Sequence, residues 1–232
     1  MFEQLKLERF KAARFYMIYI AIALIAAAGG SYGYLKFPEG LGLGKVFADA
    51  VCDTSLLFVP ATVTAWLLGN DFLYRTIHNP IKLGSSRASV IMAKALTTFA
   101  VSLMIHLTDI TAKIVGYGLR YGFDSSLFTT GNLLWLLVVM VQVCAITSFV
   151  VLIVFAAKNA LAGIALTVVF TFITCNILRN FLDGKTAFKL SCFSLAQTND
   201  VSTLVLSGIF AAITIAVVLG LTQLVFRKAE IK

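Results

Sequence analysis

The sequence is short of charged residues. Asp, Glu, Lys and Arg make up 13% of its 232 residues, whereas an ordinary globular domain contains about 25%. Hydrophobic residues account for 59%, and the mean hydropathy is +0.93. These values exclude an ordinary soluble domain and indicate an integral membrane protein. Because the apolar residues form long continuous runs rather than alternating with polar ones, the expected fold is all-α rather than a barrel.

Cysteine and histidine are also scarce. The four cysteines are scattered singly, with no CxxC pair, which excludes a disulfide framework and a zinc site. Neither His78 nor His106 has a metal-ligand neighbour, and no Ser-His pair accompanies a GxSx-type turn. An intramembrane enzyme is therefore weakly supported, and no metal or catalytic residue is assigned.

A phosphate-binding loop is missing as well. Residues 35–46, LKFPEGLGLGKV, are rich in glycine and come nearest to one. However, Glu39 stands where the first glycine is needed, and Lys45 is followed by Val46 rather than by Ser or Thr. We therefore expect no nucleotide or other cofactor to bind to this chain.

The apolar runs predict a single transmembrane domain over residues 1–232 with six membrane-spanning helices. The first 14 residues combine bases with Phe2, Leu5 and Phe10, which is typical either of a helix on the membrane surface or of a solvated basic leader. Segment 179–200 is too apolar for a free loop and too short for a domain, and is expected outside the cell. The six predicted spans are 15–34, 47–68, 90–110, 133–156, 160–178 and 201–226.

The second predicted span carries unusual residues. Pro60 stands near its middle, where a proline usually kinks a helix. Asp49 and Asp53 are one helical turn apart at its outer end. We interpret them as acids at a helix N-terminus, stabilised by the helix dipole, although a patch that attracts substrate is an alternative.

Further polar residues follow at the end of the third span. His106, Asp109 and Lys113 are spaced by three and four residues, so they share one helix face and Asp109 can pair with Lys113. A structural pair near the interface and a proton relay are both open. In the first span, Gly29 and Gly33 either permit close helix approach or end the helix.

The distribution of bases sets the orientation. With the N-terminus inside, 12 of the 19 Lys and Arg residues are cytoplasmic and seven are external. By the positive-inside rule, both termini and residues 70–94 then lie in the cytoplasm. Since the bases flank apolar segments, the net charge of +8 favours membrane lipids rather than nucleic acid as partners. The external bases are Lys36, Lys45, Lys113, Arg120, Arg179, Lys185 and Lys189.

The longest polar interruption on the cytoplasmic side is NDFLYRTIHNPIKLGSSRASVIMAK, residues 70–94. It opens with an acid, alternates aromatic and apolar residues with basic ones, and contains Pro80 and Gly84. Ser85, Ser86 and Arg87 close it before the next apolar run. This pattern predicts a short interfacial helix on which something outside the membrane pushes.

Taken together, these features resemble the membrane subunit of an ABC-2-type transporter, a permease that works with a separate ATP-binding-cassette protein. Family members tend to show an acid, then Gly-Thr, an apolar-basic turn, Ser-Arg, and a Lys in the third span. Here Arg75 replaces the glycine. In its small size and its segment DFLYRTIHN, the chain is most similar to bacteriocin or lantibiotic immunity permeases and to amphipathic peptide exporters of Gram-positive bacteria. The residues that carry the likeness are Asp71, Thr76, Ile77, Pro80, Ser86, Arg87 and Lys94.

The resemblance implies a division of labour along the chain. Residues 70–88 would form a coupling helix that docks in a cleft of the ATPase, residues 1–14 an interfacial helix, and residues 179–200 short re-entrant helices. Two permease copies, or two related subunits, would join two ATPases that hold the ATP and Mg. The candidate coupling residues are Asp71, Phe72, Tyr74, Arg75, Thr76, Ile77, His78 and Arg87.

Within this segment, we expect Phe72, Tyr74 and Ile77 to be apolar anchors on the ATPase. The bases Arg75, His78, Lys82 and Arg87 would meet acids of the ATPase or phospholipid headgroups. The alternative is that all of them are ordinary interface residues without a partner.

The function expected from the sequence is an ABC exporter permease in the bacterial cytoplasmic membrane. It would move a hydrophobic or amphipathic peptide, or a lipid-like compound, with energy from the partner ATPase, since a chain without a nucleotide site needs force from elsewhere. The alternative is a stand-alone channel or transporter driven by an ion gradient through His106, Asp109 and Lys113.

Overall fold

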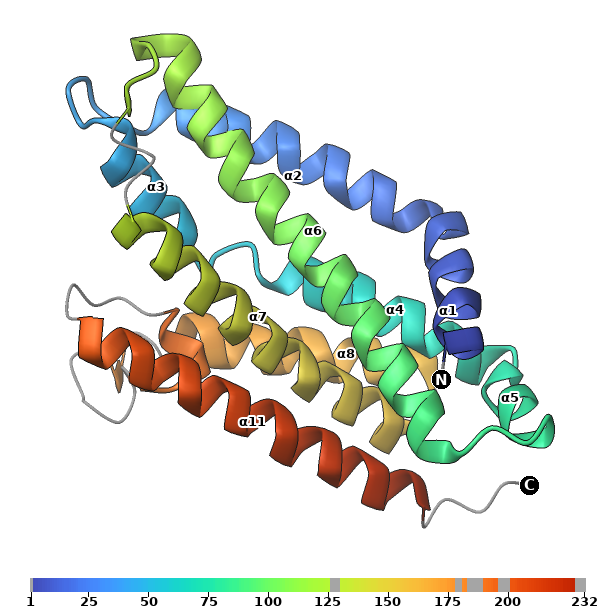
Figure 1. The fold of residues 1–232 in the computed structure, drawn as a ribbon. Helices are drawn as coiled ribbons and strands as arrows, with labels where there is room; N and C mark the ends of the chain where they lie inside the picture. The colour runs from blue at the N-terminus through green and yellow to red at the C-terminus, as the bar shows by residue number, and fades with distance from the viewer. Residues whose placement is uncertain (1, 126–129, 178–180, 183–189, 196–200, 228–232) are drawn as a thin grey trace.

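The computed structural model describes residues 2–125, 130–177, 181–182, 190–195 and 201–227, which are helical apart from turns and short connections and contain no strand (Figure 1). The α-helices are α1 Phe2–Arg14, α2 Tyr16–Leu35, α3 Leu43–Cys52, α4 Phe58–Leu73, α5 Asn79–Lys82, α6 Arg87–Tyr121, α7 Thr130–Ala157, α8 Ala160–Phe172 and α11 Val201–Arg227. Three short pieces accompany them: η1 Thr76–His78, the π-helical η3 Ile173–Ile177 and η4 Cys192–Ser194.

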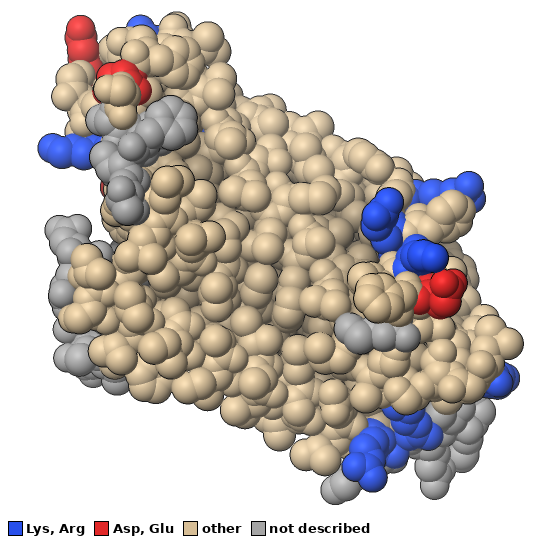
Figure 2. Space-filling view, in the orientation of Figure 1, with Lys and Arg blue, Asp and Glu red and all other residues tan. Residues whose placement is uncertain are grey.

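Four of the described helices are long and apolar enough to cross a membrane: α2, α6, α11 and the Gly131–Ala157 part of α7. On the face shown in Figure 2, charged side chains lie at two opposite ends, with uncharged residues between them. This distribution is the one a bilayer requires, because charge within the hydrocarbon is costly. The all-helical membrane fold predicted from composition is confirmed.

The second predicted span, 47–68, is not one helix. The chain leaves α3 after Cys52 and begins α4 only at Phe58. Pro60 therefore lies in the first turn of α4, where its missing N–H costs no intrahelical hydrogen bond. The expectation of a kink at Pro60 in mid-helix is wrong, because the interruption precedes it.

The break also corrects the interpretation of the two acids. Asp49 lies in the last turn of α3 and Asp53 is its C-cap residue. A helix C-terminus carries partial negative charge, so the helix dipole disfavours acids there rather than stabilising them. Asp53 instead forms an ion pair with Lys113 of α6, so a contact from another helix offsets the unfavourable end of α3.

Glycines bring α2 and α6 into close contact. A Cβ added to Gly33 would overlap the backbone of Lys113, and one added to Gly116 would overlap the carbonyl of Gly30. Since α2 continues to Leu35, Gly29 and Gly33 do not end the helix. Of the two interpretations left open by the sequence, close helix approach is confirmed. The other main packings are α7 against α11 and α4 against α8.

The turn between α7 and α8 is tight, in agreement with the three residues left between the predicted spans 133–156 and 160–178. Lys158 adopts a left-handed conformation, with φ 52°. The Asn159 side chain accepts hydrogen bonds from the backbone N–H groups of Leu161 and Ala162, which caps α8.

Most of segment 179–200 lies outside the described residues, and so do the re-entrant helices expected there. Among its described residues, 190–195 pack on the helices. Phe193 contacts the rings of Phe149 and Phe170 at centroid distances of 5.8 and 6.0 Å.

Candidate functional site

The segment between α4 and α6 is built from short pieces rather than one helix. After α4 ends at Leu73, the chain forms η1 and the four-residue α5. It turns again at Gly84, with φ 88°, and the Ser86 side chain caps α6 by accepting a hydrogen bond from the Ser89 N–H. The residues from Leu73 to Gly84, here called the 73–84 tip, lie at one end of the molecule beside α1 (Figure 1).

Arg75 has a left-handed backbone, with φ 54° and ψ 24°. This conformation costs an ordinary L-residue about 1–2 kcal/mol, and glycine adopts it freely. It is also the position at which the sequence lacks the expected glycine. The left-handed turn therefore forms in this chain with an arginine in place of the residue that adopts it without strain.

Only part of the predicted coupling set is exposed on the tip. Tyr74 is 70% exposed, and its neighbours Leu73 and Arg75 are exposed as well. Leu83, which the sequence interpretation did not single out, is 85% exposed. These side chains form the surface that a partner can reach, while the side chain of His78 lies outside the described residues.

Two of the expected apolar anchors point inward instead. Ile77 is 1% exposed and belongs to a buried cluster with Ile91 and Phe155. The half-buried Phe72 packs edge-on against the Phe155 ring, at a centroid distance of 5.5 Å. In this conformation both residues attach the tip to the helices behind it, so their direct contact with an ATPase stays a prediction.

Arg87 is occupied by the C-terminal helix. Its guanidinium donates hydrogen bonds of 3.0 and 2.8 Å to the backbone carbonyls of Phe226 and Arg227, and lies 5.8 Å from the Phe226 ring centroid. The start of α6 is thereby tied to the end of α11. This contact places the end of α11 at the same end of the molecule as the tip (Figure 1).

Asp71 is the centre of a buried ion network that joins three helices. One of its carboxylate oxygens accepts a hydrogen bond of 2.8 Å from Lys11 of α1 and one of 2.5 Å from Thr76. The other oxygen accepts from Lys94 of α6. Lys94 also donates to Glu8 of α1, at 3.0 Å. The tip is thus anchored at its base to α1, α4 and α6.

The network is nearly closed to solvent. Glu8, Asp71 and Lys94 are buried, and only Lys11 reaches the surface in part. Burial alone would lower the pKa of Lys11, but its hydrogen bond to Asp71 and the charges of Asp71 and Glu8 outweigh burial and hold this pKa above its ordinary value of 10.5. Since the stabilising pair is lost only as pH rises through that raised pKa, it is fully formed at neutral pH.

From the sequence, Asp71 and Lys94 were placed in segment 70–94, but Asp71 was assigned to contact with the partner ATPase. Glu8 was not singled out, although its spacing of three from Lys11 is a local sign of pairing. The same contacts also decide between the two interpretations of the first 14 residues. Because Glu8 and Ala12 are buried against the bundle, α1 is a packed helix rather than a solvated leader.

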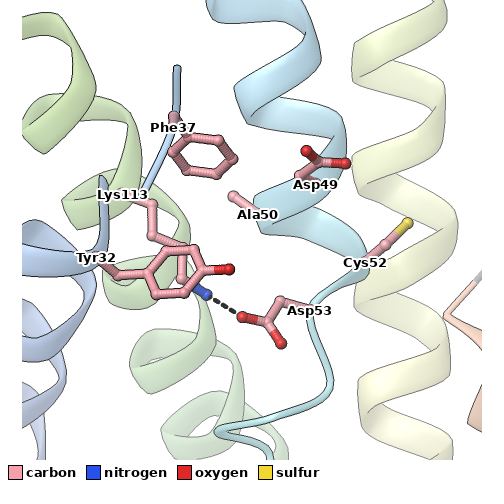
Figure 3. A pocket seen from close by; sticks show the side chains of 7 residues that line it. All are labelled: Tyr32, Phe37, Asp49, Ala50, Cys52, Asp53 and Lys113. Atoms are coloured by element: carbon pink, nitrogen blue, oxygen red, sulfur yellow. Dashed lines mark hydrogen bonds and ion pairs between the residues drawn. The ribbon is translucent and has the colours of Figure 1, made fainter. Parts of the chain in front are cut away.

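A second group of charges lies toward the opposite end of α6. Lys113 Nζ forms ion pairs of 2.6 Å with Asp109 and 2.7 Å with Asp53. The predicted pairing of Asp109 with Lys113 is therefore confirmed. Lys113 also lines a cavity of about 220 Å³ together with Tyr32, Phe37, Asp49, Ala50, Cys52 and Asp53; its pair with Asp53 and the adjacent Tyr32 ring are drawn in Figure 3.

Neither group is a candidate metal site. Within the described residues, no cluster of three or more His, Cys, Asp or Glu side chains is arranged to hold a metal ion. The chemistry available in both places is that of ion pairing between helices.

Comparison with protein families gives one match. The model described as ABC-2 family transporter protein matches residues 1–174, which include the tip, the ion network around Asp71 and the charges around Lys113. No curated protein and no solved structure matches the chain.

Proposed function

The chain belongs to the ABC-2 transporter family, and we propose that it is the permease subunit of an exporter powered by a separate ATP-binding-cassette ATPase. Its cargo is a hydrophobic or amphipathic peptide, or a lipid-like compound. The ATP and Mg²⁺ bind to the ATPase. Two permease copies, or two related permeases, assemble with two ATPases in a bacterial cytoplasmic membrane.

The observation that carries the proposal is the combination of an exposed tip with a buried, ion-paired base. Tyr74 and Leu83 are the large exposed side chains on which an ATPase could act. Behind them, Asp71 links the base of the tip to Lys11 of α1 and Lys94 of α6. A force on the tip is then transmitted to three helices as one unit, since packed and ion-paired elements move as rigid bodies.

The described helices also support six membrane crossings with the tip on the cytoplasmic side. The four long helices are whole crossings, the interrupted α3–α4 pair is a fifth, and α8 with its uninterrupted π-helical continuation η3 is a sixth. Broken helices are compatible with a bilayer where neighbouring helices satisfy their backbone groups. The tip, α1 and the end of α11 then face the cytoplasm, in agreement with the excess of bases predicted there.

The test is binding of soluble ATP-binding-cassette ATPases from the same cell to the purified permease. Tyr74→Asp and Leu83→Asp change exposed tip residues without entering the core, so both variants fold and lose ATPase binding at least tenfold. Leu35→Asp is the matched control, because Leu35 is as exposed as Tyr74 and lies at the end of α2 that is remote from the tip (Figure 1). Unchanged binding by both tip variants contradicts the proposed docking surface.

The alternative, a transporter driven by an ion gradient alone, makes a different prediction. Asp109→Asn would then abolish transport, while loss of the ATPase would leave transport intact. The export proposal requires the reverse dependence on the ATPase. Transport measured in cells without the ATPase gene separates the two functions.

A further inference from the structure

The charges around Lys113 are incompletely paired. Asp109 is 2% exposed and His106 is 3% exposed. One carboxylate oxygen of Asp109, Oδ2, accepts a hydrogen bond from Lys113. The other, Oδ1, has no hydrogen-bond partner among the described residues. His106 Nε2 is likewise buried without a partner there. Buried polar atoms are nearly always satisfied, so two orphans on one helix face need an explanation.

Both side chains line one small pocket, together with Asp53 and apolar residues of α2, α4 and α6. The pocket has no room for a water molecule. A water therefore cannot satisfy Asp109 Oδ1 or His106 Nε2 as the side chains stand, because a bridging water needs space for itself as well as polar partners. A proton bound to Asp109 requires no such space.

The charges that face the pocket leave an excess of one negative charge. Lys113 is shared by two carboxylates, Asp53 and Asp109. His106 cannot supply the balance, because an imidazolium has two N–H donors and Nε2 has nothing to donate to. A buried carboxylate without full compensation takes up a proton rather than remaining ionised.

The neighbouring helices bring no further cation. From α2 come Ile25 and the ring of Tyr32, whose centroid lies 5.6 Å from Lys113 Nζ. From α3 comes Asp49, one turn before Asp53 and a lining residue of the adjoining cavity. The residues of α4 that line the pocket carry no charge.

We propose that Asp109 is a proton-binding site. One proton forms an O–H bond with Oδ1 and brings the Asp53, Asp109 and Lys113 group to neutrality, while Oδ2 keeps its hydrogen bond from Lys113. The proton comes from a hydronium ion of the bulk solvent, which is left as water, and it reaches the site through the adjoining cavity of about 220 Å³ that Asp53 and Lys113 line (Figure 3). Release of the proton restores a second full anion beside Lys113 and changes how strongly α6 holds the α3–α4 break.

The test is infrared spectroscopy of the purified full-length permease in lipid nanodiscs at pH 7. Wild-type protein shows the C=O stretch of one protonated carboxyl group, which shifts in D₂O. Asp109→Asn loses this band. Asp49→Asn keeps it, and is the matched control because it removes an acid of the adjoining cavity that pairs with no described residue. Asp109→Glu, which keeps an acid, moves the band instead of removing it and covers the case in which the Asn variant does not fold.

The assignment is overturned if wild-type protein shows no carboxyl band or if the band survives in Asp109→Asn, and loss of a surviving band in Asp53→Asn would assign the proton to Asp53. A band abolished by Na⁺ but not by choline at equal ionic strength also overturns it, because the site then takes a metal cation. Since the measurement uses the permease alone, its result is independent of whether an ATPase binds to the tip.

Discussion

Asp71 joins three elements at the base of the tip. Its carboxylate is buried and accepts hydrogen bonds from three elements, through Lys11, Thr76 and Lys94. A buried ion pair is not in itself a strong source of stability, because desolvation offsets most of the attraction. Removing one partner is different, because the charges left behind stay buried.

Asp71→Ala should therefore destabilise the protein by about 3–5 kcal/mol, since Lys94 would keep only Glu8. The measurement is reversible unfolding of the purified protein in detergent. Glu3→Ala is the control: it breaks the exposed pair with Lys6 on the same α1 helix and should change stability by less than about 1 kcal/mol. Equal effects of the two substitutions would contradict the buried network.

Arg75 offers the opposite expectation, a stabilising substitution. Arg75→Gly relieves the left-handed strain at φ 54°, and greater chain entropy in the unfolded state offsets part of the gain. We expect a net increase of about 1 kcal/mol or less in the free energy of unfolding. Arg75→Val, with a β-branched side chain at the same φ, should lower it, and a stabilising Val variant would contradict the backbone assignment.

At the scale of whole elements, the contact between α2 and α6 depends on the absence of side chains. Gly33 and Gly116 let each backbone approach the other directly, as small residues do at helix interfaces in membranes. This contact also places α2 beside Asp109, since a Cβ at Gly29 would lie 2.9 Å from Asp109 Oδ1. The geometry of the buried charges thus depends on the glycines of the neighbouring helix.

Gly116→Ala should force the two helices apart and destabilise the protein by about 1–3 kcal/mol, the usual cost of overpacking. Gly220→Ala is the control on α11, because a Cβ there meets nothing within 4 Å. The control should be neutral or stabilising by up to about 1 kcal/mol, since alanine favours a helix over glycine. Thermal unfolding of the two variants distinguishes them, and a stabilised Gly116→Ala variant would refute the close approach.

At the scale of the whole molecule, the two charged ends carry different elements. The end that carries the tip also holds α1 and the end of α11, whereas the other end holds the loops before α3 and after α6 (Figure 1). A permease driven from the cytoplasm needs the tip inside and the cavity at Lys113 toward the outside.

This orientation predicts which cysteines an impermeant maleimide can reach in intact cells. Glu39→Cys, in the exposed loop before α3, should be labelled directly. Leu83→Cys on the tip should be labelled only after the membrane is permeabilised. The reverse pattern would place both termini outside.

The sequence alone determined the class of the protein, most of its helices and the pairing of Asp109 with Lys113. Continuous apolar runs and a spacing of four residues are local properties of the sequence. The helices and this ion pair can therefore be predicted without knowing which helices pack together. For the same reason the start of α11 at Val201 and the turn at Lys158 agree with expectation.

Only the tertiary structure decided the break between α3 and α4 and the partners of the buried charges. Lys94 meets Glu8 across 86 positions of sequence, and Lys113 meets Asp53 across 60. Such pairs depend on where the helices lie, and the cost of burying each charge is offset only once its partner from another helix is in place. Local pattern therefore identified the charged residues. Packing determined that Asp71 joins the base of the tip to α1 and α6, and that Asp109 Oδ1 has no hydrogen-bond partner among the described residues.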